Sequence, residues 1–227
     1  MRARPRASIS VAPLCHSSRV PRPDPATAAR TIGRVDPAFR ALVRRVGPPP
    51  RRRAAPVAAR FASLTRSVTY QLLATKAAAT IHARVVALCE DEVTPERILA
   101  AGHDHLRAVG LSHAKAAAML DLAERTLDGR LALARHGAMS DADVTREVVA
   151  ARGLGVWSAH MYLMQTLGRP DVWPTGDFGV RHGWSLLHGL DEPVTERALR
   201  PLGDPFAGVR SEVAWYCWRA VELERAR

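Results

Sequence analysis

Helical periodicity runs through almost the whole chain after Phe61, and it constrains the fold more than any other feature. Small and apolar residues recur at helical spacing in residues 63–73 and 76–89. Helix-start signals recur along the chain, at Thr94 before a proline, at Ser112 and at Ser140. Runs of alternating β-branched residues are missing, so we expect no substantial sheet. The sequence therefore predicts an all-α protein with short connections.

The positive charge of the chain is confined to its first part. The formal net charge is +11, but residues 1–60 alone carry 14 arginines, no lysine and 2 acidic residues, so the remainder is close to neutral. Residues 1–32 are rich in Arg, Pro, Ser and Ala, and we expect a disordered leader. It could be a DNA-binding arm, a targeting leader or the product of a wrongly assigned start codon. The folded domain is expected over residues 33–227, with a short helix from Asp36 to Val46.

Several classes of protein are excluded by composition. No apolar stretch reaches the roughly 18 residues needed to cross a bilayer, and no secretory signal is apparent. Cys15, Cys89 and Cys217 are odd in number and far apart, which argues against a disulfide framework and a four-cysteine metal site. Cys89 and Cys217 are expected to be buried. We expect a cytoplasmic protein associated with the nucleoid.

A glycine-rich hairpin occupies residues 151–159. Gly153 and Gly155 permit a turn too tight for side chains, and Leu154 between them can pack into the core. The outgoing helix presents free N–H groups, from Gly155 through Val156 to Ser158, which suit a DNA phosphate. Carbonyls of the same turn could hold a monovalent cation, K⁺ or Na⁺, whereas no side-chain metal site is expected. An ordinary αα-hairpin with glycine caps explains the same residues equally well.

A second segment follows the hairpin, with the sequence WPTGDFGVR at residues 173–181. Hairpin and aspartate together resemble the helix-hairpin-helix DNA glycosylase superfamily, in particular its 3-methyladenine DNA glycosylase II branch. Residues 70–81, 106–116 and 210–219 are similar to other parts of that branch. The resemblance covers about residues 36–222.

This resemblance implies a two-lobed all-α fold with the active site in the cleft between the lobes. Residues 66–173 would form the lobe that contains the hairpin, and residues 33–65 with 174–227 would form the second lobe. The implied partner is double-stranded DNA containing alkylated bases, bound by a monomer.

Asp177 is the catalytic candidate. It stands at a helix start, where the anionic form is favoured, and the resemblance implies that it stabilises the oxocarbenium-like sugar as the base leaves. Bifunctional relatives carry a catalytic lysine at the position of Trp157. Because an indole cannot form a Schiff base, no strand-nicking activity is expected. The resemblance places Trp157 in the base pocket, whereas a buried aromatic at a helix start is the alternative.

Three further residues are candidates for contacts with the flipped nucleotide. Leu72 falls where relatives place the side chain that fills the vacated stack, although a core leucine is nearly as good an interpretation. Phe178 is expected either in the pocket or in the core, and Tyr70 is a weaker candidate for the pocket. Trp215 and Trp218, three residues apart on the last helix, are expected in the core.

The function implied is a monofunctional DNA glycosylase that hydrolytically excises alkylated purines, of the 3-methyladenine and 7-methylguanine type, in base excision repair. Three alternatives stay open. One is a glycosylase for another damaged base. The second is a DNA-binding module that kept the hairpin and lost activity, because a fold alone does not secure a function. The third is an all-α protein–protein scaffold in which the hairpin is a coincidence.

Overall fold

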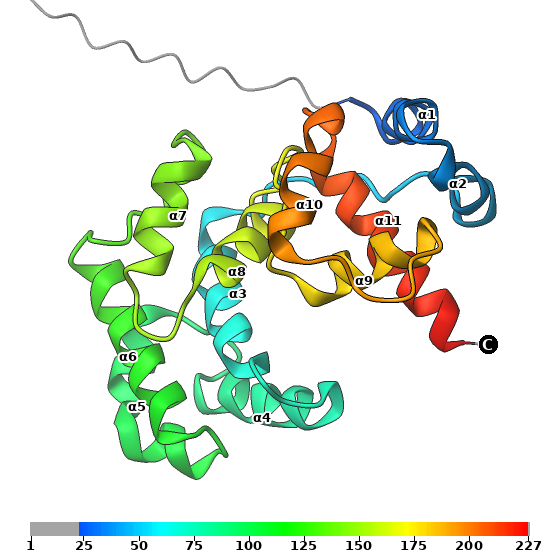
Figure 1. Cartoon of the computed structure of the whole chain (residues 1–227). Helices are drawn as coiled ribbons and strands as arrows, with labels where there is room; N and C mark the ends of the chain where they lie inside the picture. The colour runs from blue at the N-terminus through cyan, green and yellow to red at the C-terminus, as the bar shows by residue number, and fades with distance from the viewer. Residues whose placement is uncertain (1–22, 227) are drawn as a thin grey trace, which may run out of the picture.

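The computed structural model describes residues 23–226, and in that range every regular element is helical (Figure 1). The predicted all-α class is therefore confirmed. The elements are α1 (Pro25–Val35), η1 (Pro37–Phe39), α2 (Arg40–Val46), α3 (Val57–Tyr70), α4 (Thr75–Leu88), α5 (Pro95–Ala108), α6 (His113–Leu127), α7 (Asp141–Val149), α8 (Val156–Met161), η2 (Tyr162–Thr166), α9 (Phe178–Leu187), α10 (Glu196–Leu202), η3 (Asp204–Phe206) and α11 (Arg210–Arg225).

One lobe consists of the consecutive elements from α3 to η2. Helix α6 packs on α5 and α3, and α7 packs on α8. Fully buried apolar side chains such as Leu64, Met119 and Leu122 fill the space between these helices. Helix α8 runs directly into η2, a single π-helical turn. We call this part, residues 57–166, the hairpin lobe.

The second lobe joins both ends of the described chain. Helix α11 packs on α9, α2 and α1. Its centre is aromatic, because the fully buried ring of Phe39 contacts the rings of Trp184, Phe206 and Tyr216 edge-on, at centroid distances of 5.7, 5.9 and 6.4 Å. Edge-on pairs of this kind are favourable beyond the area that they bury.

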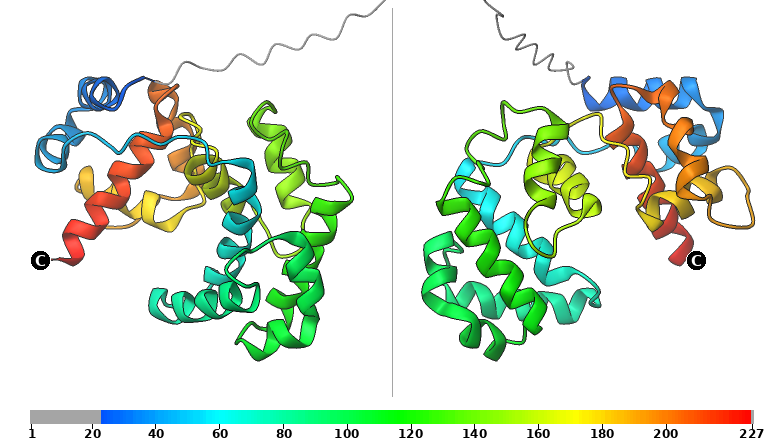
Figure 2. Two further views of the ribbon diagram at one scale, coloured as in Figure 1. Left: turned by 180° about the vertical axis from the view of Figure 1, so that it is seen from behind. Right: turned by 60° about the vertical axis from the view of Figure 1, so that its left-hand side comes forward.

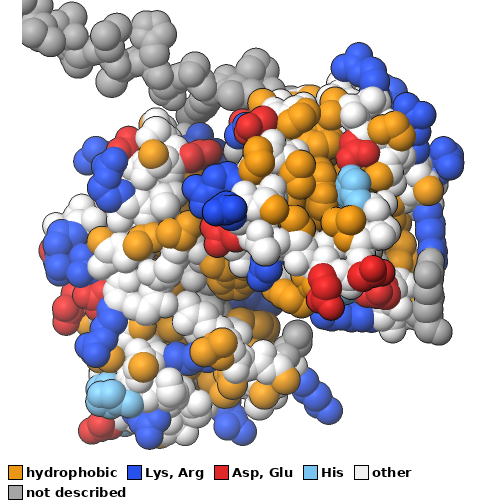
Figure 3. All heavy atoms as spheres, viewed as in Figure 1, with side chains coloured by type: hydrophobic (Ala, Val, Ile, Leu, Met, Phe, Trp, Pro, Cys, Tyr) orange, Lys and Arg blue, Asp and Glu red, His pale blue; other side chains and the backbone are white. Residues whose placement is uncertain are grey.

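The chain crosses between the lobes twice, at residues 47–56 and again at residues 167–177 (Figure 2). The space-filling view shows the surface hollowed between the two lobes (Figure 3). The predicted lobe boundary at residue 66 falls inside α3, which is continuous from Val57 and packs on α6 and η2. Residues 57–65 therefore belong to the hairpin lobe, which corrects the prediction.

The leader prediction is wrong for its last residues. Residues 25–32 lie in α1, which Asp24 caps by accepting hydrogen bonds from the backbone N–H groups of Ala26 and Thr27. Ala28, Ala29 and Ile32 bury one face of this helix in the second lobe. Their spacing of one and three residues is typical of one helix face. The prediction missed the helix because the surrounding sequence is rich in Arg and Pro. Residues 1–22 of the predicted leader lie outside the described residues.

Other local predictions are confirmed. Thr94, Ser112 and Ser140 each accept a hydrogen bond from a backbone N–H in the first turn of α5, α6 and α7. Asp36 does the same for η1, which leads into α2. Cys89 and Cys217 are buried free thiols. Within residues 23–226 no helix combines the length and the apolarity needed to cross a membrane.

Helices α9 and α11 touch backbone to backbone. A Cβ atom added at Gly183 would lie only 2.0 Å from the carbonyl oxygen of Cys217. No side chain fits in that space, so glycine at this position brings the two helices together. This close contact holds the start of α9 in a fixed position against α11.

Candidate active site at Asp177

Asp177 caps helix α9 at the point where the chain enters the second lobe. Its Oδ1 accepts a hydrogen bond from the backbone N–H of Val180 at 2.8 Å. The extended backbone of Asp177 and the helical backbone after it are those of an N-cap residue. Because only 8% of the residue is exposed, its carboxylate is almost fully removed from water.

Two indole groups, one from each lobe, hold the carboxylate. Trp157 of α8 donates from Nε1 to Oδ2 at 2.7 Å, and Trp218 of α11 donates from Nε1 to Oδ1 at 2.9 Å. None of the ion pairs among residues 23–226 involves Asp177. Neutral N–H groups therefore satisfy the carboxylate, and its negative charge is not neutralised by a cation.

The charge on Asp177 affects its surroundings. Burial raises the pKa of the Cys217 thiol, and the negative charge of Asp177 raises it further. This thiol is buried on α11, next to Trp218 in the chain, and is protonated at neutral pH. Cys217 is thus an uncharged, unreactive thiol near the Asp177 carboxylate.

Gly179 makes room for the Trp218 indole. A Cβ atom at this position would lie 2.9 Å from Cδ1 of Trp218 and 3.1 Å from Oδ1 of Asp177. A side chain there would push the indole away from the carboxylate. The sequence Asp177-Phe178-Gly179 thus supplies both the acceptor and the space for its donor.

A hollow of about 220 Å³ lies beside the carboxylate in the hairpin lobe. Trp157 joins the two, because its indole lines the hollow while its Nε1 contacts Asp177. Tyr70 also lines it, and the guanidinium of Arg66 lies 4.4 Å from the centre of the Tyr70 ring. The remaining lining residues are Ser63, Leu64, Ser67, Met161, Tyr162, Gln165 and Thr166.

The glycine hairpin has the predicted tight geometry at Gly153 but not at Gly155, where an added Cβ would meet no atom within 4 Å. Gly153 has a φ of +75° and its Cα faces Ala118, where an added Cβ would be 3.1 Å away. Leu154 is buried, and Gly155 and Val156 are exposed at the start of α8. Gly155 is the N-cap of α8, and no side chain caps this helix. The first N–H groups of α8 at Gly155 and Val156 are thus on the surface, whereas Ser158 is buried.

Leu72 is fully exposed at the apex of the turn between α3 and α4, and its φ of 55° is uncommon for a leucine. This excludes the interpretation of Leu72 as a core residue. Lys115 of α6 donates from Nζ to the carbonyl oxygens of Thr69 and Gln71, at 2.8 and 2.7 Å. Gln71 in turn donates from Nε2 to the carbonyl of Gly153 at 2.9 Å. The Leu72 turn is therefore tied both to α6 and to the hairpin.

The core interpretation of Phe178 is wrong, and its contact with the flipped nucleotide stays a prediction. Phe178 is more than half exposed, so it is not in the core, and it is absent from the lining of the hollow. Its ring stacks on His182 at 5.8 Å, and the Arg181 guanidinium lies 5.6 Å from its centre. Phe178 is an exposed aromatic residue directly beside Asp177.

Trp218 is the site residue that sequence reasoning missed. We expected it in the core with Trp215, whereas its indole N–H points at Asp177. Its neighbours on the same helix face, Ala214, Cys217 and Val221, are indeed buried. The face was therefore predictable. The reach of the long indole to a carboxylate 41 residues earlier in the chain was not.

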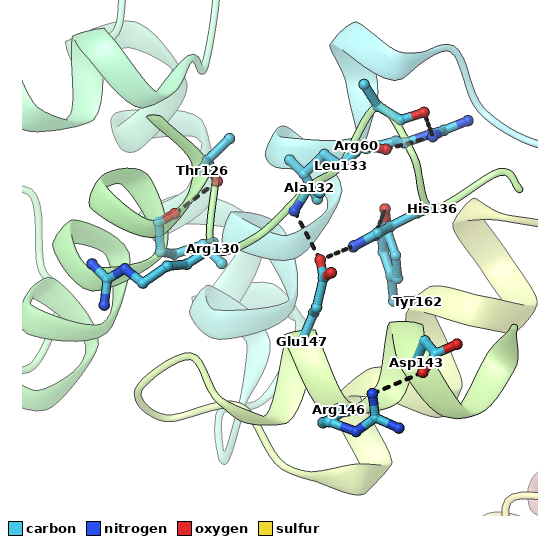
Figure 4. Close-up of polar contacts among 12 residues, drawn as sticks. Arg60, Thr126, Arg130, Ala132, Leu133, His136, Asp143, Arg146, Glu147 and Tyr162 are labelled. Carbon is cyan, nitrogen blue, oxygen red and sulfur yellow. Dashed lines mark hydrogen bonds and ion pairs between the residues drawn. The ribbon is translucent and has the colours of Figure 1, made fainter. Parts of the chain in front are cut away.

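A second polar cluster lies inside the hairpin lobe (Figure 4). His136 is fully buried, with Nε2 3.0 Å from Oε2 of Glu147 and Nδ1 3.0 Å from the Tyr162 hydroxyl. Glu147 also accepts from the backbone N–H of Ala132, and Arg60 donates to the carbonyl of Leu133 at 2.6 Å. These bonds tie the loop between α6 and α7 to α7, η2 and α3.

Comparisons with known proteins match most of the chain. A family model described as HhH-GPD superfamily base excision DNA repair protein matches residues 65–205. DNA-3-methyladenine glycosylase 1 of Schizosaccharomyces pombe is 29% identical over 72% of this chain and 73% of its own length.

Solved structures give the same result. The 3-methyladenine DNA glycosylase of Schizosaccharomyces pombe in complex with abasic DNA has a TM-score of 0.77 and 27% identity, over 85% of this chain and 95% of that one. The DNA-3-methyladenine glycosidase of Bacillus halodurans has a TM-score of 0.78 and 27% identity, over 88% and 91%. The two-lobed arrangement is thus shared with both.

Proposed function

This chain belongs to the HhH-GPD superfamily of base excision DNA repair proteins, and from that membership we propose that it is a monofunctional DNA glycosylase for alkylated purines. The substrates are of the 3-methyladenine and 7-methylguanine type, and the product is an abasic site. Relatives that carry the name DNA-3-methyladenine glycosylase support this choice of lesion. The observation that carries the proposal is the Asp177 carboxylate, held by one indole from each lobe without a neutralising cation.

Asp177 acts as the catalytic carboxylate. A purine alkylated at N3 or N7 is cationic and leaves readily, so the enzyme need not protonate it strongly. The demand is for negative charge beside the sugar carbon, where positive charge develops as the bond breaks. A carboxylate satisfied only by neutral N–H donors offers that charge, and it can also orient the attacking water.

Trp157 binds the extruded base. Its indole lines the hollow next to the carboxylate, and the face of an indole attracts an electron-poor cationic ring. Tyr70 lines the same hollow and extends the aromatic surface. Because Trp157 has no amine, the enzyme does not cleave the strand by a Schiff-base route.

The DNA duplex lies across the mouth of the cleft. Leu72, the exposed residue at the apex of its turn, enters the stack that the base leaves. The exposed backbone N–H groups of Gly153, Gly155 and Val156 bind the phosphate beside the lesion, and the buried Ser158 supports them from the first turn of α8. Phe178, exposed beside Asp177, contacts the deoxyribose side of the flipped nucleotide. The protein acts as a monomer, in the cytoplasm at the nucleoid.

A monovalent cation, K⁺ or Na⁺, fits at the hairpin turn. The carbonyl of Gly153 is used by Gln71 and that of Ala151 by the N–H of Leu154. The carbonyls of Arg152 and Leu154 accept none of the hydrogen bonds found between described residues outside the helices. A cation on these two oxygens would add positive charge where the phosphate binds. DNA affinity is then expected to fall when K⁺ is replaced by tetramethylammonium at constant ionic strength.

The test of the function is base release from methylated duplex DNA under single-turnover conditions. The wild type should release 3-methyladenine or 7-methylguanine, and Asp177→Asn should be slower by at least about 100-fold. Asparagine remains a good N-cap, so thermal melting can verify that the variant is folded. A wild-type protein that binds the duplex but releases neither base would contradict the proposal.

A further inference from the structure

Arginines gather on the outer helices of the second lobe. Residues 30–53 contain eight arginines, no lysine and a single acidic residue, Asp36. Oδ2 of Asp36 lies 2.8 Å from Nε2 of His188, and Oδ1 accepts from the backbone N–H of Ala38. The one carboxylate of the segment therefore bonds to His188 and Ala38 and not to the arginines. Lys and Arg side chains line the edge of the molecule formed by α1 and α2 (Figure 3).

A surface hollow of about 330 Å³ lies between α1 and α2. No acidic residue lines it, and its lining residues are Ala29, Arg30, Gly33, Arg34, Arg40, Val43 and Arg44. Two of the arginines are braced within the protein, because Arg40 donates from Nε to the carbonyl of Gly33 and Arg30 donates to the Thr27 hydroxyl, both at 2.8 Å. Arg34 and Arg44 are exposed, and neither takes part in an ion pair among residues 23–226.

Within each of the two helices, the paired arginines start at a spacing comparable with that of successive phosphates, and their charge is opposite. Arg30 and Arg34 are four residues apart on α1, and Arg40 and Arg44 are four apart on α2. Side chains at this spacing start about 6 Å apart on a helix, which is comparable with the separation of successive phosphates on one DNA strand. Guanidinium groups bind phosphate oxygens with two parallel hydrogen bonds.

The hollow and the Asp177 site lie on opposite sides of α11. Trp218 reaches Asp177 from one face of this helix, and the Tyr216 hydroxyl donates to the carbonyl of Gly47 at the end of α2 from another, at 2.9 Å. Residues two apart point about 200° apart around a helix. In Figures 1 and 2, α1 and α2 form the edge of the second lobe that is farthest from the hairpin lobe. A duplex seated at the Leu72 turn and the hairpin therefore does not reach the hollow.

We propose that this arginine hollow is a second DNA-binding surface, which takes the phosphates of another duplex segment while the cleft holds the first. The protein can then pass directly from one segment to another during its search for lesions. The proposal rests on the proposed function only in taking DNA as the partner. A second duplex is the polyanion that a DNA-bound enzyme meets most often, and the binding needs no base recognition.

The dissociation of labelled undamaged duplex from the full chain tests this proposal. The labelled complex is mixed with increasing concentrations of unlabelled duplex, and the dissociation rate is followed by anisotropy. Direct transfer makes the wild-type rate rise severalfold with the concentration of competitor, because the new duplex binds before the old one leaves. The double variant Arg34→Gln/Arg44→Gln should dissociate at the low-competitor rate throughout.

A matched control removes the same charge elsewhere. Arg197→Gln/Arg225→Gln changes two exposed arginines on α10 and α11, and it should keep the wild-type dependence on competitor. Base release from methylated duplex, measured on all three proteins, tests the proposed function separately. We expect equal rates, because no change touches Asp177 or its donors.

Three results would overturn the inference. The first is a wild-type dissociation rate that does not depend on competitor, and the second is a double variant that keeps the dependence. The third is equal acceleration by polyglutamate of matched charge, which would make the hollow a site for acidic protein chains. A wild-type protein that shows direct transfer but releases no base would contradict the proposed function and would not affect the inference about the arginine hollow.

Discussion

At the scale of single residues, the Asp177 carboxylate is oriented by its three N–H donors. Trp218→Phe keeps an aromatic ring but removes the donor to Oδ1. A hydrogen bond to a charged group contributes about 1.5–3 kcal/mol. We therefore expect single-turnover base release to slow by roughly 10-fold to 100-fold, with DNA affinity little changed.

Trp215→Phe is the control for that measurement. Trp215 lies one turn earlier on α11 and packs against Tyr216, with ring centres 4.9 Å apart. It has the same chemistry and a similar partly buried environment without a contact to Asp177. Equal rates for Trp218→Phe and the wild type would show that the Val180 and Trp157 donors suffice to orient the carboxylate.

Asp177 and Trp157 both lie at helix starts, and the helix-start signals and the glycine hairpin predicted those positions. Asp177 is the N-cap of α9 and Trp157 lies in the first turn of α8, whereas the hydrogen bond between them joins the two lobes. Trp218 has no such signal, because its role depends on how α11 sits against α9. Phe178 shows the same limit, since its exposure depends on the packing of the whole second lobe.

At the scale of elements, the turn between α3 and α4 depends on a lysine from α6. Lys115 is the charged donor that holds the last carbonyls of α3, and burial lowers its pKa. Lys115→Met removes both hydrogen bonds at a helix end where positive charge is favoured. The strained backbone of Leu72 should then sample other conformations, and base release should slow by about 10-fold.

A double-mutant cycle with Leu72→Ala tests whether Lys115 acts through Leu72. If it does, the Met substitution should slow a Leu72→Ala enzyme much less than it slows the wild type. Lys115→Arg should restore part of the rate, and 2-aminopurine fluorescence beside the lesion should report the same pattern for base unstacking. Independent, additive effects would mean that Lys115 serves the stability of α6 instead.

Helix α1 shows why element boundaries were harder to predict than the fold. Its buried face consists of only Ala28, Ala29 and Ile32, so composition dominated the prediction of a leader. The helix forms because Asp24 caps it and α11 offers a surface to pack on. The lobe boundary failed for a related reason, since nothing in the sequence from 57 to 65 says which lobe α3 joins.

At the scale of the whole molecule, the buried His136 and the partly buried His82 and His160 make the free energy of unfolding depend on pH. Burial lowers the pKa of His136 below its usual 6.5, although the Glu147 carboxylate opposes this, and burial also lowers the pKa values of His82 and His160. Below about pH 6.5 the unfolded chain takes up protons that the folded protein does not. The contribution of these histidines to the free energy of unfolding should therefore be largest above about pH 6.5. It should fall as the pH drops, by up to about 1.4 kcal/mol per pH unit for each histidine.

Urea unfolding at several pH values between about 7 and about 5.5 measures this slope. His136→Gln should make the slope shallower, whatever it does to stability at neutral pH. His105→Gln, which removes an exposed imidazole, is the matched control. An identical slope in the wild type and in His136→Gln would contradict the assignment of this proton uptake to the His136 cluster.

The contact of Gly183 with the Cys217 carbonyl has a consequence for which parts of the molecule open first. Helices packed this closely admit neither water nor a side chain between them. The amide hydrogens of α9 and α11 should consequently exchange with solvent deuterium among the slowest in the protein, whereas those of the Leu72 turn should exchange quickly. The enzyme would then meet its lesion with the Leu72 turn, which opens easily, and perform its chemistry at helices α9 and α11, which open last.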